Sequence, residues 1–212
     1  MKQVKTTIFP TEVWVIDDVL IDYQMKSIVE SVYNDDSGKE KPIFQSRPDL
    51  HKDAAYRPLV DKIIECAKNY VEDKKWQYEG FKITGMWSNI QREGQNFQPH
   101  THSNNIISGV YYAKSNKNRL KEEHEKVVNS DIVFVDPRPQ AGVLKPNNLE
   151  SHQNNSDLWF FPSLENRMLL FPSWLSHYVP INKSKEDRMS IAFNLMLTGQ
   201  VGKPEEYQSA DF

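Results

Sequence analysis

The sequence contains little of what marks a secreted, disulfide-stabilised or membrane-embedded protein. Its 212 residues include a single cysteine, Cys66, which excludes an intramolecular disulfide and is typical of a reducing cytoplasm. Because Cys66 stands among Ile63, Ile64 and Ala67, we predict a buried core thiol rather than a nucleophile. No uncharged apolar run approaches the ~20 residues that cross a bilayer, and residues 1–9 lack a signal-peptide core. We therefore expect a soluble, cytoplasmic protein.

Glycine is also scarce, and neither sign of charge dominates. The chain has eight glycines against twelve prolines, and 11% of its residues are aromatic, which argues against disorder. With 26 basic and 29 acidic residues the net charge is -3, so neither a nucleic acid nor an anionic membrane is expected as a partner. We predict one domain over residues 1–212, because no repeat or linker divides the chain. The pattern carries no information on oligomeric state.

Two amphipathic helices are expected first, as a helical support over about residues 17–74. Apolar residues recur at helical spacing after Asp17 and Asp18, which we take as the N-terminal cap. A polar turn at residues 34–38 ends this helix, and a second apolar stripe runs through residues 59–71. Both helices have polar opposite faces, so each is expected to lie against something larger.

From Phe81 onward the apolar period changes and predicts short β-strands. Turn residues separate runs rich in β-branched and aromatic side chains. The predicted strands cover residues 83–90, 106–113, 132–135, 158–161, 167–171 and 188–197. This order indicates an α+β chain, mainly β, with a sandwich or barrel core over about residues 81–200. Two polar segments, 116–130 and 140–157, are read as loops and are where we expect substrate determinants.

Three of the six histidines suggest a metal site. His100 and His102 flank one residue at the mouth of a predicted strand, and a strand places residues i and i+2 on the same face. His177 ends a later apolar run and could add a third imidazole, a ligand that suits iron, zinc and copper. The alternative is a pair of hydrogen-bonded loop histidines without metal. The other histidines stand in polar, loop-like surroundings and are not expected to be functional: His51, His124 and His152.

Three motifs in the sequence resemble those of the Fe(II)/2-oxoglutarate-dependent oxygenases. They are His-Thr-His-Ser-Asn-Asn-Ile-Ile-Ser-Gly-Val-Tyr-Tyr from residue 100, Leu-Leu-Phe-Pro-Ser-Trp-Leu-Ser-His ending at residue 177, and Arg-Met-Ser-Ile-Ala-Phe-Asn from residue 188. The resemblance spans about residues 87–197 and is closest to the prolyl-hydroxylase-like branch, within it a poorly characterised bacterial and phage group. It implies a double-stranded β-helix, a cupin-like jelly roll, with the N-terminal helices packed on one sheet.

The resemblance also implies a role for particular residues. His100 and His177 match histidine ligands of Fe(II), and Arg188 matches the basic residue that pairs with the far carboxylate of 2-oxoglutarate, with O2 as the second cosubstrate. Arginine suits this task because its planar fork binds a carboxylate with two hydrogen bonds. Further candidates for the cosubstrate pocket are Ser190, Asn89, and one of Tyr111 and Tyr112, of which only one can face inward.

His102 stands where the family usually places a carboxylate, so it removes one negative charge from the expected metal site. Three functions therefore stay open. The first is a nonhaem Fe(II)- and 2-oxoglutarate-dependent dioxygenase that hydroxylates a protein side chain or small metabolite. The second is a three-histidine metal dioxygenase that does not use 2-oxoglutarate, and the third is a non-catalytic jelly-roll metal-binding module. Arg188 favours the first, because a structural metal needs no nearby cation. Three aromatics are expected to pack rather than to bind substrate: Trp87, Trp159 and Tyr178.

Overall fold

The computed structural model describes residues 1–36, 43–115, 131–205, 207 and 209–212. The predicted loop at 116–130, with His124, lies outside these residues, as do positions 37 and 38 of the predicted turn. Two helices and twelve strands are formed within the described part, together with three short 3-10 helices at Leu50–Lys52, Ala54–Tyr56 and Pro139–Gly142. No helix in these ranges is both long and apolar enough to span a lipid bilayer.

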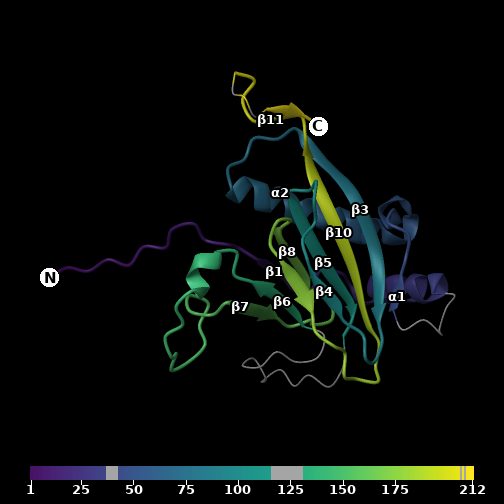
Figure 1. The fold of residues 1–212 in the computed structure, drawn as a ribbon. Coiled ribbons are helices and arrows are strands. Elements are labelled where there is room, and N and C mark those ends of the chain that lie inside the picture. Colours follow the sequence, from purple (N-terminus) through teal and green to yellow (C-terminus); the bar gives the residue numbers. More distant parts are fainter. Residues whose placement is uncertain (37–42, 116–130, 206, 208) are drawn as a thin grey trace.

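The two predicted helices are present as α1 (Asp22–Asp35) and α2 (Arg57–Asp73), and both lie behind the larger sheet in Figure 1. The apolar stripe of α2 is buried at Leu59, Ile63, Ala67 and Tyr70, which explains why a helix with so many charged residues is stable here. Cys66 flanks this stripe and is only partly buried, against the prediction of a fully buried thiol. Burial still raises the pKa of its thiol, which favours the unreactive protonated form.

The predicted start of α1 is wrong. Its N-cap is Ile21, whose backbone N–H donates to Gln24 Oε1 at 3.3 Å, rather than Asp17 or Asp18. Asp17 instead accepts hydrogen bonds from Nε and Nη2 of Arg167 at 2.6 and 2.8 Å. Asp18 has a φ of 56°, so the chain turns sharply before the helix begins. An acidic pair near a helix is therefore used for a long-range ion pair and a turn.

Two antiparallel sheets form the body of the molecule. The larger has the order β1-β8-β5-β10-β3-β2, with strands Trp14–Ile16, Met168–Pro172, Ile107–Lys114, Arg188–Thr198, Gly80–Gln91 and Ile43–Gln45. The smaller has the order β4-β9-β6-β7, with strands Phe97–His100, His177–Val179, Ile132–Val135 and Leu158–Phe161. Strands β11 (Gln200–Val201) and β12 (Ala210–Asp211) make a separate pair near the C-terminus. All six strands that the sequence predicts are present, within three residues at each end.

Alternation along the strands divides the buried side chains into two cores. Outward residues of the larger sheet, such as Tyr111 and Ile191, pack with the stripes of α1 and α2. Inward residues face the smaller sheet, and the inner core consists of Val110, Tyr112, Ile132, Phe134, Leu169, Phe171 and Leu175. Because both sheets contribute to the inner core, they pack face to face as in a jelly roll.

Strand β10 is a central strand of the larger sheet, hydrogen-bonded to β3 on one side and to β5 on the other. Its inward positions run every second residue from the pocket end: Arg188, Ser190, Ala192 and Asn194. The neighbouring strands have register shifts opposite this row, β5 opposite Met189–Ser190 and β3 opposite Asn194–Leu195. Such bulges commonly re-aim side chains next to active sites.

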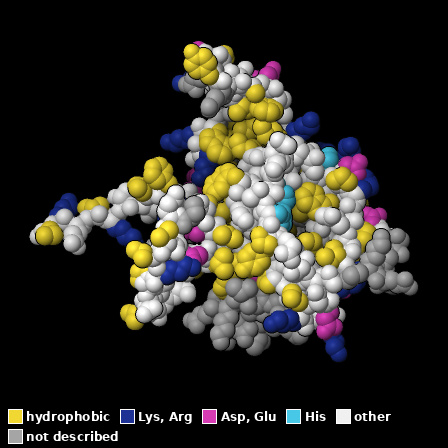
Figure 2. Space-filling model, viewed as in Figure 1, with side chains coloured by type: hydrophobic (Ala, Val, Ile, Leu, Met, Phe, Trp, Pro, Cys, Tyr) yellow, Lys and Arg dark blue, Asp and Glu magenta, His cyan; other side chains and the backbone are white. Residues whose placement is uncertain are grey.

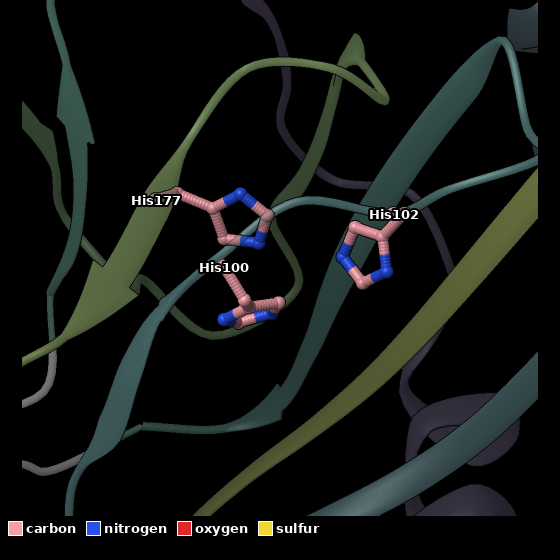
Figure 3. A group of neighbouring side chains, drawn as sticks. All are labelled: His100, His102 and His177. Atoms are coloured by element: carbon pink, nitrogen blue, oxygen red, sulfur yellow. The ribbon is translucent and has the colours of Figure 1, made fainter.

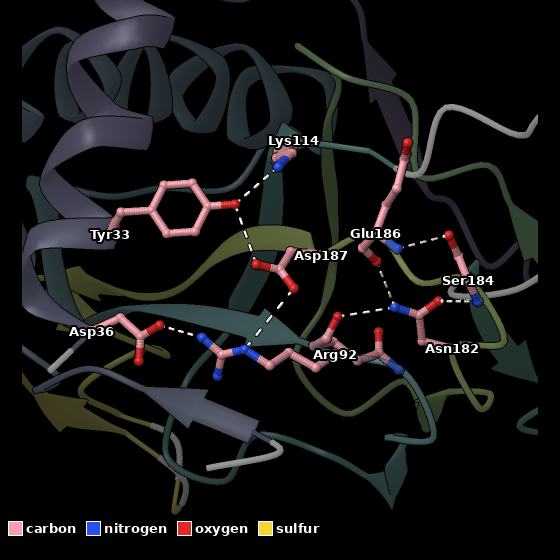
Figure 4. Close-up of polar contacts among 9 residues, drawn as sticks. Tyr33, Asp36, Arg92, Lys114, Asn182, Ser184, Glu186 and Asp187 are labelled. Atoms are coloured by element: carbon pink, nitrogen blue, oxygen red, sulfur yellow. Dashed lines mark hydrogen bonds and ion pairs between the residues drawn. The ribbon is translucent and has the colours of Figure 1, made fainter. Parts of the chain in front are cut away.

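A polar network ties α1 to the ends of β3, β5 and β10 (Figure 4). Lys114 Nζ donates to the Tyr33 hydroxyl at 2.9 Å, and that hydroxyl donates to Asp187 Oδ2 at 3.3 Å. Arg92 pairs with the buried Asp36 and lies 3.9 Å from Asp187 Oδ1. The network therefore fixes the residue that immediately precedes Arg188.

The turn that leads into Arg188 is organised by the fully buried side chain of Asn182. Its Nδ2 donates to the carbonyl oxygens of Gln91 and Glu186, both at 3.0 Å, and its Oδ1 accepts from the Ser184 N–H at 2.9 Å. One amide thus makes three hydrogen bonds to backbone groups of this turn and of the end of β3, as is usual for a buried polar side chain.

We expect Asn182→Ala to lower the free energy of unfolding by about 2 to 3 kcal/mol, because three hydrogen bonds to backbone groups are lost at a buried position. Chemical denaturation monitored by circular dichroism measures the change. Asn154→Ala, an exposed position, is the control and should leave stability within about 0.5 kcal/mol. Equal stability of the two variants would contradict a structural role for the Asn182 amide.

Candidate metal centre

Three histidine rings meet at one point between the two sheets (Figure 3). One nitrogen from each of His100, His102 and His177 lies within 4.8 Å of the others. The ring centroids are 4.4 Å apart for His100 and His177, 5.1 Å for His100 and His102, and 5.2 Å for His102 and His177. The structure therefore brings together the three histidines that the sequence singles out. His51 and His152 lie outside this cluster.

The three rings reach this point by different routes. His100 ends β4 and His177 begins β9, and the two residues are directly opposed in the antiparallel pair. His102 lies two residues beyond the end of β4, so the prediction that one strand places both on the same face is wrong. Instead, the His102 N–H donates to the Ser173 carbonyl oxygen at 2.9 Å, which fixes the loop after β4.

Two of the rings are oriented by backbone carbonyls. Nδ1 of His177 lies 2.9 Å from the Leu175 oxygen, and Nδ1 of His100 lies 2.7 Å from the Gln98 oxygen. Because a carbonyl only accepts, each Nδ1 carries the proton and each Nε2 is left with a free lone pair. This is the usual arrangement of a metal-binding histidine, whose second nitrogen is held by an acceptor.

The donor set fits a transition-metal ion. Metal–imidazole bonds of about 2.1 Å place nitrogens on one face of an octahedron about 3 Å apart. The separations of up to 4.8 Å therefore require the rings to approach one another by less than about 2 Å. Three nitrogens would leave the remaining positions of the metal open to other ligands.

Aromatic neighbours bury the ring of His177. Its ring lies 4.8 Å from that of Phe171 and 5.7 Å from that of Phe134. Burial lowers the pKa of His177 to about 3, and burial together with the nearby His100 lowers that of His102 to about 4. Both rings are therefore neutral at neutral pH, as metal binding requires.

These pKa values predict how the metal-free protein responds to acid. In the unfolded chain His102 and His177 become protonated below about pH 6.5. In the folded chain protonation occurs only near pH 4 for His102 and near pH 3 for His177. Stability should therefore fall as the pH drops from 6.5 toward 4. We expect the melting temperature of the chelator-treated protein to drop less between pH 7 and pH 5 in His102→Gln/His177→Gln than in wild type. His152→Gln, at an exposed loop position, should retain the wild-type dependence; an unchanged dependence in the double variant would contradict this account.

A buried arginine lies in the same pocket as the three histidines. Arg188 is 2% exposed, its Nη1 donates to Ser190 Oγ at 3.2 Å, and its guanidinium lies 4.9 Å above the ring of Tyr112. Its Nε has no hydrogen-bonding partner within the described part of the chain. Burial lowers the pKa of the guanidinium, although arginine remains charged in proteins. A buried cation of this kind calls for an anion.

The structure separates the two neighbouring tyrosines. Tyr112 faces the inner core and Arg188, whereas Tyr111 faces the helices and donates to Asn166 Oδ1 at 3.1 Å. The Tyr112 hydroxyl is buried without a hydrogen-bond acceptor among the described residues, and burial raises its pKa to about 12, so it keeps its proton. Asn89 lines the pocket directly opposite Ser190, and its Oδ1 accepts from Gln45 Nε2 at 3.3 Å.

Sequence reasoning did not assign nine of the fifteen residues that line the pocket. Trp87, expected to pack in the core, lines the pocket with its ring 6.0 Å from His102. Gln45 and Phe97 also line it, from the short strands β2 and β4, which the sequence pattern does not reveal. Trp87 lies two residues before Asn89 on β3, so both side chains share one face of the strand. The assignment of Asn89 to the pocket could therefore have predicted that Trp87 lines it too. Figure 2 shows histidine side chains reaching the surface between hydrophobic ones.

Comparison with known proteins identifies the family of this chain. A family model described as "Putative 2OG-Fe(II) oxygenase" matches residues 85–194, more than half of the chain, a span that includes the three histidines and Arg188. The chain belongs to the 2OG-Fe(II) oxygenase family. The cofactor and cosubstrates of this oxidoreductase family are Fe(II), 2-oxoglutarate and O2. No curated protein sequence matches the chain.

Several solved structures share the fold at low sequence identity. A Pseudomonas putida prolyl-4-hydroxylase has a TM-score of 0.58 at 10% identity, with 89% of each chain covered. HygX from Streptomyces hygroscopicus, with nickel, 2-oxoglutarate and hygromycin B bound, has a TM-score of 0.63 at 11% identity over 89% of this chain and 84% of that one. The 2-oxoglutarate-dependent epimerase SnoN of nogalamycin biosynthesis has a TM-score of 0.64 at 10% identity, covering 93% and 83%. The predicted double-stranded β-helix is confirmed.

Proposed function

We propose that this oxygenase hydroxylates a carbon–hydrogen bond of a protein side chain or a small metabolite. In this proposal His100, His102 and His177 hold Fe(II), and Arg188 holds the far carboxylate of 2-oxoglutarate. The observation that supports it is the presence, in one pocket, of three converging imidazoles and a buried arginine whose Nε has no hydrogen-bonding partner among the described residues. A purely structural metal would not need that cation.

The cosubstrate end of the pocket has its donors arranged around one position. Arg188 offers its guanidinium fork, which can bind a carboxylate with two hydrogen bonds. The Ser190 hydroxyl accepts from Arg188 and so keeps its own proton for the same carboxylate. The Tyr112 hydroxyl adds a buried donor, and Asn89 offers its amide from the neighbouring strand. A dicarboxylate bound here would satisfy polar groups that otherwise lack partners.

At the metal end, the protein contributes ligand orientation and exclusion of water. Bound Fe(II), together with 2-oxoglutarate and O2, supplies the oxidising chemistry of the family. The carbonyls of Gln98 and Leu175 hold two rings with Nε2 toward the centre, and Phe134 and Phe171 shield His177 from solvent. The substrate would approach past Trp87, which lines the same pocket beside His102.

The absence of a carboxylate among the three converging side chains supports a second candidate, a three-histidine dioxygenase that does not use 2-oxoglutarate. Arg188 argues against it, because a reaction without an acidic cosubstrate leaves the buried cation unused. The deciding experiment adds 2-oxoglutarate to the anaerobic Fe(II)-loaded protein and records the metal-to-ligand charge-transfer absorption, then admits O2 and measures succinate. We expect the band and succinate; their absence from a metal-loaded protein would overturn the proposal in favour of this second candidate.

Both substrate classes are retained because the structural neighbours include a prolyl hydroxylase and a protein crystallised with hygromycin B. A cytoplasmic location is proposed from the single cysteine, Cys66. The near-neutral charge balance supports a primary substrate that is neither a nucleic acid nor a membrane surface.

A further inference from the structure

A row of buried polar side chains lies behind His102. Asn194 on β10 and Ser108 on β5 are directly opposed in the sheet, and Ser108 Oγ donates to Asn194 Oδ1 at 2.8 Å. Ser108 Oγ also lies 2.8 Å from Ser173 Oγ, and Asn194 Nδ2 lies 3.4 Å from Nδ1 of His102. The backbone carbonyl of Ser173 accepts a hydrogen bond from the His102 N–H, so the hydrogen bonds lead back to His102. Three segments that are distant in the sequence, at residues 102–108, 173 and 194, thus meet through these side chains.

These polar residues occupy positions where apolar side chains would be expected. Ser108 and Ser173 are at most 1% exposed and Asn194 is 8% exposed, and their neighbours along the strands belong to the two cores. Burying hydroxyl and amide groups is unfavourable unless they are hydrogen-bonded, and apolar groups of the same size would avoid that cost. The contact with the His102 ring distinguishes this row from a merely satisfied polar cluster.

His102 needs such support more than the other two ligands. His100 and His177 belong to paired strands, and backbone carbonyls hold their Nδ1 atoms. His102 follows the end of β4, and the group facing its Nδ1 is the Asn194 amide. An amide differs from a carbonyl because it can present either a donor or an acceptor after a half-turn about its last bond.

We propose that Asn194 is a positioning residue for His102, held in turn by Ser108 and Ser173, and that it sets which His102 nitrogen carries the proton. This inference rests on the proposed function, in which His102 ligates the metal. As arranged in the structure, Ser108 donates to Asn194 and the Asn194 amide nitrogen faces Nδ1, which places the ring proton on Nε2.

The hydrogen bonds along this row can also form with every donor and acceptor exchanged. With the amide turned, Asn194 Oδ1 accepts a proton from Nδ1–H, Nδ2 donates to Ser108 Oγ, and Ser108 donates to Ser173 Oγ. Each of the three side chains can both donate and accept, so the reversal keeps every hydrogen bond. It also frees the Nε2 lone pair, which points toward His100 and His177 (Figure 3). Metal binding at His102 is therefore coupled to which of the two hydrogen-bond arrangements the row adopts.

The test measures metal affinity rather than turnover. Binding of Co²⁺ to the chelator-treated full chain is followed by calorimetry for wild type, Asn194→Leu and Asn194→Asp, whose side chains all branch at Cγ. We expect Asn194→Leu to weaken Co²⁺ binding about 10- to 100-fold, the usual effect of removing the partner of a ligating histidine. Asn194→Asp should bind at least as tightly as wild type, because a carboxylate accepts from both Nδ1–H and Ser108.

Controls separate this role from packing and from the proposed function. Ser173→Ala is the second variant and should also weaken binding, whereas Ser88→Ala, a buried serine on β3 whose hydroxyl has no partner among the described residues, should not. Melting temperatures identify any variant that is not folded. If Asn194→Leu binds Co²⁺ as tightly as wild type does, or more tightly than Asn194→Asp does, the positioning role of Asn194 is overturned. The proposed metal site would still stand. If wild type binds no Co²⁺, the metal site and the inference both fail. Nitrogen NMR of the His102 ring supplies the direct readout, with Nδ1 protonated in the diamagnetic Zn²⁺ form.

Discussion

Arg188→Ala should lose 2-oxoglutarate binding while the histidine site still binds Fe(II). The guanidinium is buried, stacked over Tyr112 and hydrogen-bonded to Ser190, so its removal leaves a bound carboxylate without a charge partner at a buried position. Truncating one member of a buried charge pair costs about 2 to 5 kcal/mol. The dissociation constant for 2-oxoglutarate should therefore rise roughly 30-fold to several thousand-fold. Titration of the anaerobic Fe(II)-loaded protein, monitored by the charge-transfer absorption, measures it.

Two further variants make this experiment specific. Arg188→Lys keeps a positive charge but loses the fork, so we expect it to recover only part of the affinity. Arg167→Ala removes an arginine that pairs with Asp17 away from the pocket, and should bind 2-oxoglutarate like wild type. Wild-type affinity in Arg188→Ala would overturn the assignment of this residue to the cosubstrate.

The second large effect is expected for His177→Ala. This histidine is 5% exposed, is held by the Leu175 carbonyl and is enclosed by Phe134 and Phe171, so no other side chain can take its place. Removing a ligand should exceed the 10- to 100-fold loss that follows removal of a ligand's partner, so we expect Fe(II) affinity to fall by about 100-fold or more. Anaerobic competition with a coloured chelator measures the affinity.

His152→Ala serves as the matched control, because it removes an exposed histidine from a loop that is not part of the metal cluster. It should bind Fe(II) as wild type does. Comparison with His102→Ala then grades the ligands: a smaller loss at His102 is expected, since its ring is held by an amide rather than by a carbonyl. Undiminished Fe(II) binding in His177→Ala would place the metal elsewhere.

The long elements were predictable because each repeats a physical pattern several times. Strands β3 and β10 carry enough β-branched and aromatic residues to reveal their period, and α2 shows its apolar stripe over four turns. Strands β4 and β9 have only four and three residues, so no period can be read from them. They nevertheless carry His100 and His177, and only their pairing across the smaller sheet brings the two rings together.

Other features of the site depend on contacts that a sequence does not encode locally. The choice between Tyr111 and Tyr112 is decided by which face of β5 meets the smaller sheet. The position of His102 is decided by Ser173, which lies far along the chain. The polar residues of the motifs were visible in the sequence, but a buried serine or asparagine acquires a role only when its neighbours are known.

If Arg188 binds the far carboxylate as proposed, its placement on β10 limits which keto acids the pocket can hold. Inward-facing positions on a strand recur every second residue, or about every 7 Å. One additional carbon–carbon bond lengthens an acid by at most about 1.5 Å. Moving the arginine along β10 therefore cannot adjust the pocket to a cosubstrate one carbon shorter or longer, because the sheet offers only steps several times too large. Preference for a particular chain length therefore follows from the spacing of inward-facing positions on the strand. A redesign for another keto acid would have to change the length of the charged side chain rather than its position on β10.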